Sequence, residues 1–178
     1  SLFCGEIIGR VEPCPKYTPI EWQDKPEEDI VWHDNPGYKL IQGRGKVQGR
    51  LLGGCWGPLQ QIMGTNIFPD RELWEGSIIF MENISPYGSA LAALHGWRAL
   101  AASGALDVCS GIIRPAMGEK EDQMLLKGLR QEVHREDLPV LEGVDFGHRT
   151  PMTVLPIGAL AELDCASASF TILESGTV

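Results

Sequence analysis

Short hydrophobic runs alternate with helical periods along most of this chain. The runs predict strands at residues 46–52, 77–81 and 108–113, and shorter ones near 140 and at 153–155, 159–163 and 170–173. Apolar positions at helical spacing predict helices at residues 56–63, 86–102 and 119–134. The strand at 77–81, the helix at 86–102 and the strand at 108–113 make one β-α-β unit. The pattern therefore predicts an α/β fold with an antiparallel, β-rich C-terminal end.

The N-terminal part of the chain has a different composition. Five prolines stand among acidic residues and two tryptophans between residues 12 and 37. Because proline lacks a backbone N–H, we expect no regular strand pairing here but an extended connecting arm, residues 1–37, before a domain at 38–178. The tryptophans, Trp22 and Trp32, either pin the arm to the domain surface, which we favour, or stack on a ligand.

Charge and length exclude several classes of protein. The 178 residues are 43% hydrophobic and carry a formal net charge of −9, so neither a nucleic-acid polymer nor an anionic membrane is expected as the main partner. No apolar run reaches the ~20 residues that span a bilayer, and no signal peptide is visible, which predicts a cytoplasmic protein. The chain begins at Ser1 rather than at a methionine, and we expect it to be a piece of a longer or processed protein.

The cysteines and glycines do not form the usual metal or nucleotide motifs. The five cysteines are too far apart for a C-x-x-C pair, so we expect reduced thiols and no metal site. The glycines between residues 43 and 54 lack the spacing of a phosphate-binding loop or a dinucleotide fingerprint. No cofactor is predicted.

Two residues carry the candidate chemistry. Glu82 is the first charge after the apolar strand 77–81, where α/β proteins place reactive groups, although a glutamate there can also simply cap the next helix. His148 lies between Gly147 and a proline, on a loop rather than an apolar face. A glutamate and a histidine are two thirds of a hydrolytic triad, but the chain has no G-x-S-x-G elbow for a serine. Cys55 and Cys109 are weaker candidates for a nucleophile, and Cys109 is expected in the core.

Several ordered motifs resemble one known family. The stretches are GRLLGGC at 49–55 with GT at 64–65, WEGSIIFME at 74–82, FGHRTP at 146–151, LPIGA at 155–159 and LD at 163–164, preceded by GRVEP at 9–13 in the arm. In this order they resemble the C-terminal half of the LD-carboxypeptidase family of serine peptidases, which includes the muramoyltetrapeptide carboxypeptidases and the microcin immunity proteins.

The resemblance implies a fold, a chemistry and partners. It implies a swivelling three-layer β/β/α domain in which Glu82 and His148 match two members of a Ser-Glu-His triad. The serine and its oxyanion hole would belong to an N-terminal domain that has no counterpart here. Implied substrates are an amide in a peptidoglycan tetrapeptide or in a peptide-nucleotide conjugate, with Trp22 or Trp32 stacking on the nucleotide, and the implied assembly is a homodimer. Cys55 departs from the asparagine of many members.

Two other interpretations remain open at the level of sequence. In the first, the chain is a non-catalytic ligand-binding or interaction domain, where Glu82 caps a helix and His148 fixes a loop. In the second, it is a self-contained cysteine hydrolase that uses Cys55 and His148.

Overall fold

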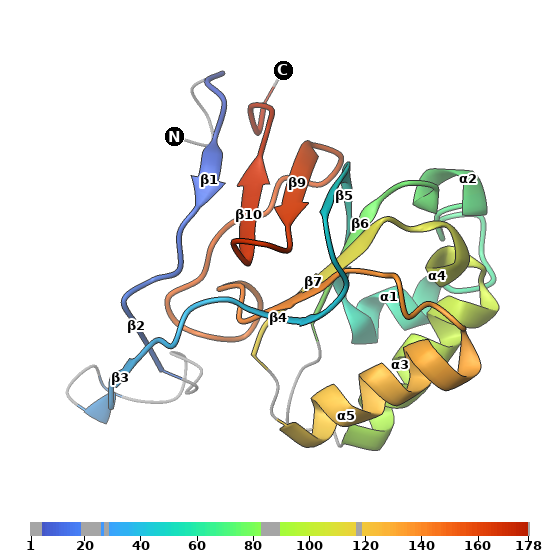
Figure 1. Cartoon of the computed structure of the whole chain (residues 1–178), viewed down its shortest axis with the longest axis horizontal. Helices are drawn as coiled ribbons and strands as arrows, with labels where there is room; N and C mark the ends of the chain where they lie inside the picture. The colour runs from blue at the N-terminus through green and yellow to red at the C-terminus, as the bar shows by residue number, and fades with distance from the viewer. Residues whose placement is uncertain (1–4, 19–25, 27–28, 83–89, 117–118, 178) are drawn as a thin grey trace.

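One mixed sheet of eight strands organises the chain in a computed structural model, which describes residues 5–18, 26, 29–82, 90–116 and 119–177 (Figure 1). The sheet order is β1-β10-β9-β5-β6-β7-β8-β4. The strands are β1 (Gly9–Val11), β4 (Lys39–Gln42), β5 (Lys46–Cys55), β6 (Ile78–Glu82), β7 (Gly111–Arg114), β8 (Val140–Glu142), β9 (Leu160–Asp164) and β10 (Ser169–Ile172).

Strand β5 joins a parallel half of the sheet to an antiparallel half. Its first five residues pair antiparallel with β9, and its last five, Leu51 to Cys55, pair parallel with β6. Strands β6, β7 and β8 continue the parallel half, whereas β10 and β1 continue the antiparallel half. The carboxyl ends of β5, β6, β7 and β8 therefore meet along one edge of the sheet.

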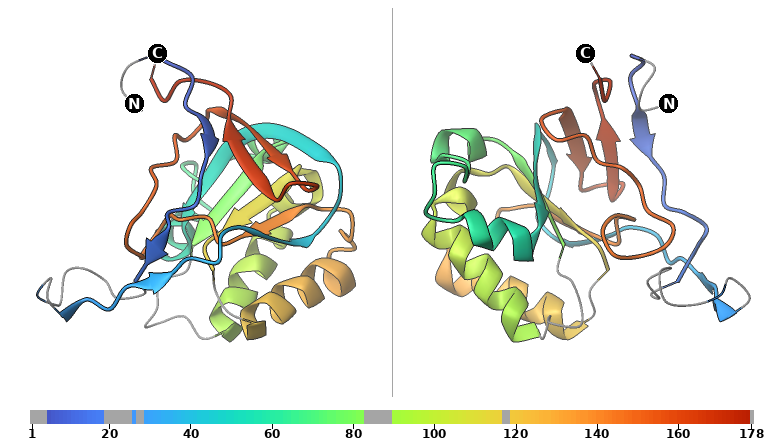
Figure 2. Two further views of the ribbon diagram at one scale, coloured as in Figure 1. Left: turned by 60° about the vertical axis from the view of Figure 1, so that its left-hand side comes forward. Right: turned by 180° about the vertical axis from the view of Figure 1, so that it is seen from behind.

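Helices cover one side of the parallel strands, as the view from behind shows (Figure 2). They are α1 (Trp56–Ile62), α2 (Arg71–Trp74), α3 (Ala90–Ala102), α4 (Ala105–Val108), α5 (Glu119–Lys127) and a π-helical turn, η2 (Gly128–Glu132). Because strand side chains alternate, Ile79 and Ile112 pack against the helices. Phe80 and Ile113 face the opposite way, into a second core with Phe170 of the antiparallel half. The antiparallel half of the sheet thus packs against the parallel half through this second core, and the helices cover the other side. The three layers confirm the predicted α/β, β/β/α class.

Three predicted elements differ from the structure. Residues 108–113 are not one strand, because residues 105–108 form α4 and β7 begins at Gly111; a short apolar run can be buried equally well in a helical turn. Residues 153–155 form no strand, and the N–H of Thr153 instead bonds the carbonyl of Asp145. The helix predicted at 119–134 ends at Glu132, followed by His134 with φ +58°.

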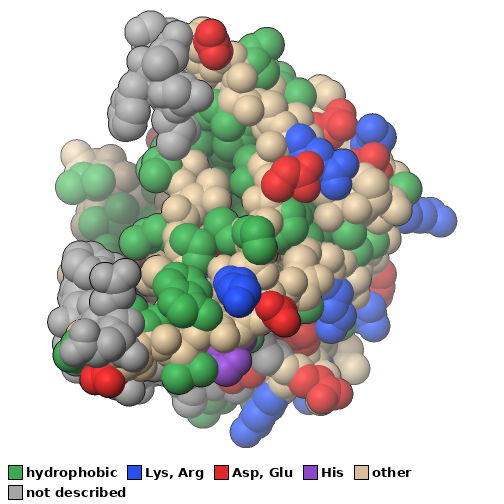
Figure 3. All heavy atoms as spheres, turned by 90° about the vertical axis from the view of Figure 1, so that its left-hand side faces the viewer, with side chains coloured by type: hydrophobic (Ala, Val, Ile, Leu, Met, Phe, Trp, Pro, Cys, Tyr) green, Lys and Arg blue, Asp and Glu red, His purple; other side chains and the backbone are tan. Residues whose placement is uncertain are grey.

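The arm lies on the left of Figure 1, the side that faces the viewer in Figure 3, and contributes strands of its own. Gly9–Val11 pairs with β10 at the edge of the sheet, and β2 (Lys16–Tyr17) pairs antiparallel with β3 (His33–Asp34). The expectation of no strand pairing between residues 12 and 37 is therefore wrong at this two-residue ladder, which fits between the prolines. Trp22 lies outside the described residues, and Trp32 is 44% exposed. None of the helices in the described residues is long and apolar enough to cross a membrane.

Candidate active site

Glu82 is the last residue of β6, at the edge where the parallel strands end. It lies opposite Cys55 of β5 in the parallel register. Two residues after Phe80, it points to the same side of the sheet as that ring, away from the helices. Its side chain is only 13% exposed, so its carboxylate is largely shielded from water.

His148 reaches this carboxylate from a loop 66 residues further along the chain. Its backbone N–H donates to Oε2 of Glu82 at 2.8 Å, and its ring Nδ1 lies 2.9 Å from the same oxygen. A neutral imidazole that donates through Nδ1–H carries its lone pair on Nε2. With 41% of its side chain exposed, His148 is therefore an imidazole oriented by a carboxylate and accessible to a reacting group.

Gly147 makes the close approach of the loop possible. A Cβ at this position would lie 1.9 Å from Oε2 of Glu82, and the backbone φ of +80° is one that side chains rarely adopt. The glycine before the histidine was the available sequence signal for a constrained loop.

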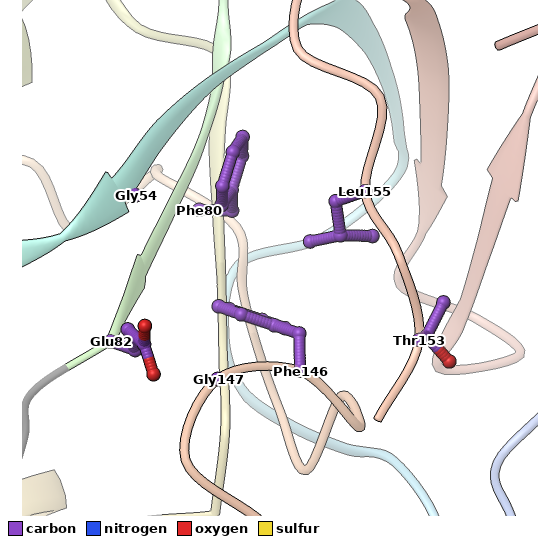
Figure 4. Close-up of a pocket in the computed structure, with 7 residues that line it drawn as sticks. All are labelled: Gly54, Phe80, Glu82, Phe146, Gly147, Thr153 and Leu155. Atoms are coloured by element: carbon purple, nitrogen blue, oxygen red, sulfur yellow. The ribbon is translucent and has the colours of Figure 1, made fainter. Parts of the chain in front are cut away.

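A pocket of about 160 Å³ opens beside Glu82 (Figure 4). Its lining residues are Gly54, Phe80, Glu82, Phe146, Gly147, Thr153 and Leu155. The rings of Phe80 and Phe146 meet edge to face at 5.9 Å. The pocket thus combines the apolar side chains of Phe80, Phe146 and Leu155 with polar groups, among them the Glu82 carboxylate.

The cysteines show little sign of activation. Cys55, at the end of β5, is half-buried; burial raises the pKa of its thiol, the N–H of Gly57 lowers it, and the charge of Glu82 raises it further. A raised pKa reduces the thiolate fraction at neutral pH, which disfavours the cysteine-hydrolase interpretation. Cys109 lies in the core, as expected, and burial raises its pKa to about 12.

Buried polar contacts hold residues 145–151, the histidine loop, in place. Asp145 is fully buried and accepts hydrogen bonds from the backbone N–H of Cys14 at 2.7 Å and from Nδ2 of Asn35 at 3.1 Å. It also pairs with Arg149 at 3.1 Å. Nothing in the sequence pattern pointed to Asn35 or Cys14, because they lie more than 100 residues from the loop.

Two other histidines lie away from the pocket. The ring of His33 lies 5.8 Å from the ring of Tyr17 in the arm, and His95 is exposed on α3; neither lines the pocket. Within the described part of the chain, no group of three His, Cys, Asp or Glu residues is arranged to hold a metal ion.

The sequence of this chain is similar to one protein family and to several known proteins. Residues 48–163, which include most of β5, all of β6 and the histidine loop, match the LD-carboxypeptidase C-terminal domain. The microcin C7 self-immunity protein MccF of Escherichia coli is 29% identical over 175 residues, which cover 89% of this chain and 48% of MccF. A putative carboxypeptidase of Treponema pallidum (strain Nichols) is 28% identical over 159 residues, 85% of this chain and 45% of that protein.

A solved structure shares the fold. MccF in complex with aspartyl sulfamoyl adenosine superposes with a TM-score of 0.81 at 24% identity, over 97% of this chain and 52% of that chain. The chain thus spans about half the length of the curated relatives it matches.

Proposed function

The chain belongs to the LD-carboxypeptidase family, and from this premise we propose that it is the C-terminal domain of a serine peptidase, in which Glu82 and His148 act in a Ser-Glu-His triad. One observation carries the proposal: a single oxygen of Glu82 accepts the backbone N–H of His148 at 2.8 Å and lies 2.9 Å from its ring Nδ1. This double contact fixes the tautomer and the direction of the imidazole, as the carboxylate of a triad does.

In this proposal His148 moves protons and Glu82 stabilises its charged form. Nε2 of His148 takes the proton from the serine hydroxyl as its oxygen attacks the amide carbonyl. The imidazolium that forms is stabilised by the adjacent Glu82 carboxylate. It then returns the proton to the leaving amine, and water repeats the cycle to release the acyl group.

We place the nucleophile in another domain. The curated relatives are about twice as long as the matched region, which leaves room for a domain that carries the serine and its oxyanion hole. Exposed apolar side chains follow His148 at Met152, Val154 and Ile157, at 54%, 58% and 68% exposure, and a second domain would cover such a surface.

The proposed substrate is an amide in a small peptide, either a peptidoglycan tetrapeptide or a peptide-nucleotide conjugate. The pocket of about 160 Å³ beside Glu82, with Phe80, Phe146 and Leu155 in its lining, has room for a small organic group. The aspartyl sulfamoyl adenosine bound by MccF supports the conjugate, because it joins an amino acid to a nucleoside. Exposed Trp32 offers an aromatic face for stacking on a base, a role that Trp22 could equally fill.

Hydrolysis by the complete protein that contains this chain tests the proposal. The assays follow release of the C-terminal residue from a muramoyl tetrapeptide and release of aspartate from aspartyl sulfamoyl adenosine. We expect turnover of at least one substrate, a loss of roughly 10³-fold or more for His148→Ala, and a loss of about 10²–10⁴-fold for Glu82→Gln. His95→Ala changes an exposed histidine of α3; it is the matched control and should stay within twofold of wild type.

Two outcomes would contradict the proposed peptidase function. Undiminished turnover by a folded His148→Ala protein would exclude the triad. Tight binding of either substrate without turnover in the wild-type protein would favour the non-catalytic ligand-binding domain.

A further inference from the structure

The histidine loop is anchored on both sides of His148 by the N-terminal arm. Asp145 precedes the histidine by three residues and accepts from Cys14 and Asn35 of the arm. After the histidine, the N–H of Thr18 donates to the carbonyl of Thr150 at 2.8 Å, and the N–H of Thr150 donates back at 3.3 Å. The loop is thereby tied to a segment more than 100 residues away in sequence.

Charge and aromatic contacts reinforce the same junction. The guanidinium of Arg149 pairs with Asp145 and lies 4.6 Å from the centre of the Tyr17 ring, a cation–π contact. Asp145 is 0% and Arg149 only 8% exposed, so each needs the other to offset the cost of burying its charge. The carboxylate of Asp145 is therefore an acceptor for donors from the loop and from the arm.

Fewer contacts hold the side chain of His148. The ring of His148 is substantially exposed, and its position depends on the Glu82 contact and on the course of the backbone between residues 147 and 149. The carbonyl of Gly147 accepts from the N–H of Arg149 at 2.9 Å, so the anchored Arg149 also shapes this backbone. A small rotation of the loop would turn the His148 N–H away from Oε2 of Glu82.

We propose that Asp145 is a positioning residue for His148: by binding the arm residues Cys14 and Asn35 together with Arg149, it sets the loop geometry that aligns the imidazole with Glu82. The inference rests on the proposed peptidase function for its kinetic consequence, but its structural consequence can be measured without turnover. The arm is then part of the active-site scaffold as well as a connection.

The test uses the complete protein labelled uniformly with ¹⁵N, in which the ring nitrogen shifts report the tautomer of His148 and the amide signals report exchange at His148 and at Ile112. In the wild type we expect the Nδ1–H tautomer and a slowly exchanging His148 amide. Asp145→Asn places an NH₂ group, itself a donor, among the donors that Asp145 binds. We therefore expect a mixed tautomer of His148. We also expect amide exchange at His148 to accelerate by at least ten times more than exchange at Ile112 in β7. The same variant should lower kcat at least tenfold and change KM less than threefold.

Two further variants separate positioning from stability. Asn35→Ala removes one arm donor and leaves the Asp145–Arg149 pair intact, and it should shift the tautomer in the same direction with a threefold to tenfold loss in kcat. Glu174→Gln is the matched control, because this carboxylate also accepts a backbone N–H, from Leu160, and pairs with an arginine, Arg50. It should leave the tautomer unchanged and kcat within twofold.

The outcomes distinguish this inference from the proposed function. If Asp145→Asn fails to fold, Asn35→Ala decides. An unchanged tautomer and unchanged relative amide exchange in the folded variants would overturn the positioning role, even where activity falls. A wild-type protein with no turnover but a tautomer that responds to Asp145→Asn would reject the peptidase and retain the positioning role.

Discussion

Gly147 allows His148 to approach Glu82 because it has no side chain. The position has a φ of +80°, and its missing Cβ is the space occupied by Oε2 of Glu82. Any larger residue would have to displace the carboxylate that orients the imidazole. The contact between Glu82 and His148 thus depends on a neighbouring residue that contributes no side chain to it.

Gly147→Ala should lower the free energy of unfolding by about 2–5 kcal/mol, the sum of ~1–2 kcal/mol of left-handed strain and ~1–3 kcal/mol of overpacking. Gly45→Ala is the matched control, with a φ of +78° and no atom within 4 Å of the added Cβ, so it should show only the strain. Urea denaturation measures both values. Equal losses in the two variants would show that the loop yields freely and that Gly147 does not constrain the Glu82 contact.

At the scale of elements, close packing between helices decides how α1 sits on the domain. Gly96 of α3 lies against the ring of Trp56, the first residue of α1, and a Cβ there would come within 2.8 Å of the indole. Trp56 is 7% exposed and belongs to the core on the helical side of the sheet. The two helices therefore approach through a position without a side chain.

Substitutions at two helical glycines should have opposite effects. Gly96→Ala forces the Trp56 ring to move and should destabilise the protein by ~1–3 kcal/mol. Gly57→Ala adds a Cβ to α1 in open space and should stabilise it by ~0.4–1 kcal/mol through the unfolded chain. Thermal and urea denaturation of both variants give the signs. Stabilisation by Gly96→Ala would contradict the tight contact with Trp56.

At the scale of the whole molecule, carboxylates bound to donors set the response to acid. Hydrogen bonds lower the pKa of five carboxylates. Each carboxylate is followed by the partner with the largest effect: Glu132 (Arg98), Asp137 (Arg135), Glu162 (Gln48), Asp164 (Lys46) and Glu174 (the Leu160 N–H). Because the pKa of each carboxyl is lower in the folded state than in the unfolded state, the unfolded state binds protons first as the pH falls. Their stabilising contribution is present above the ordinary values of 4.5 for Glu and 3.8 for Asp and is lost below them.

The urea midpoint should consequently stay nearly level between pH 7 and 5 and fall between about pH 4.5 and 3. All five side chains are at least partly exposed, so 0.5 M NaCl should reduce the difference between pH 7 and 3. A midpoint that does not change down to pH 3 would contradict the contribution of these carboxylates.

The whole fold was only partly predictable from local patterns. The runs 46–52 and 77–81 predicted strands that became β5 and β6, but β5 extends to Cys55 because its last residues pair with β6. Residues 105–108 became helical because burial against other helices satisfies a short apolar run without a strand. The antiparallel β-rich end was expected. The edge strand β1 was missed, because a strand of only three residues, Gly9–Val11, shows too little hydrophobic alternation to be recognised. The division into an arm and a domain, the cytoplasmic location and the homodimer stay predictions.

The sequence by itself determined the α/β class, the strand that ends at Glu82, the glycine-bounded loop of His148 and the family that these motifs resemble, because each depends on residues close together in the chain. Only the tertiary structure decided that one oxygen of Glu82 would receive both donors of His148, and that Asp145 would tie the loop to Asn35 and Cys14. Those contacts join residues 66 to 131 positions apart. Hydrophobic periodicity specifies which face of an element is buried, but the packing of elements from distant parts of the chain specifies which polar groups meet.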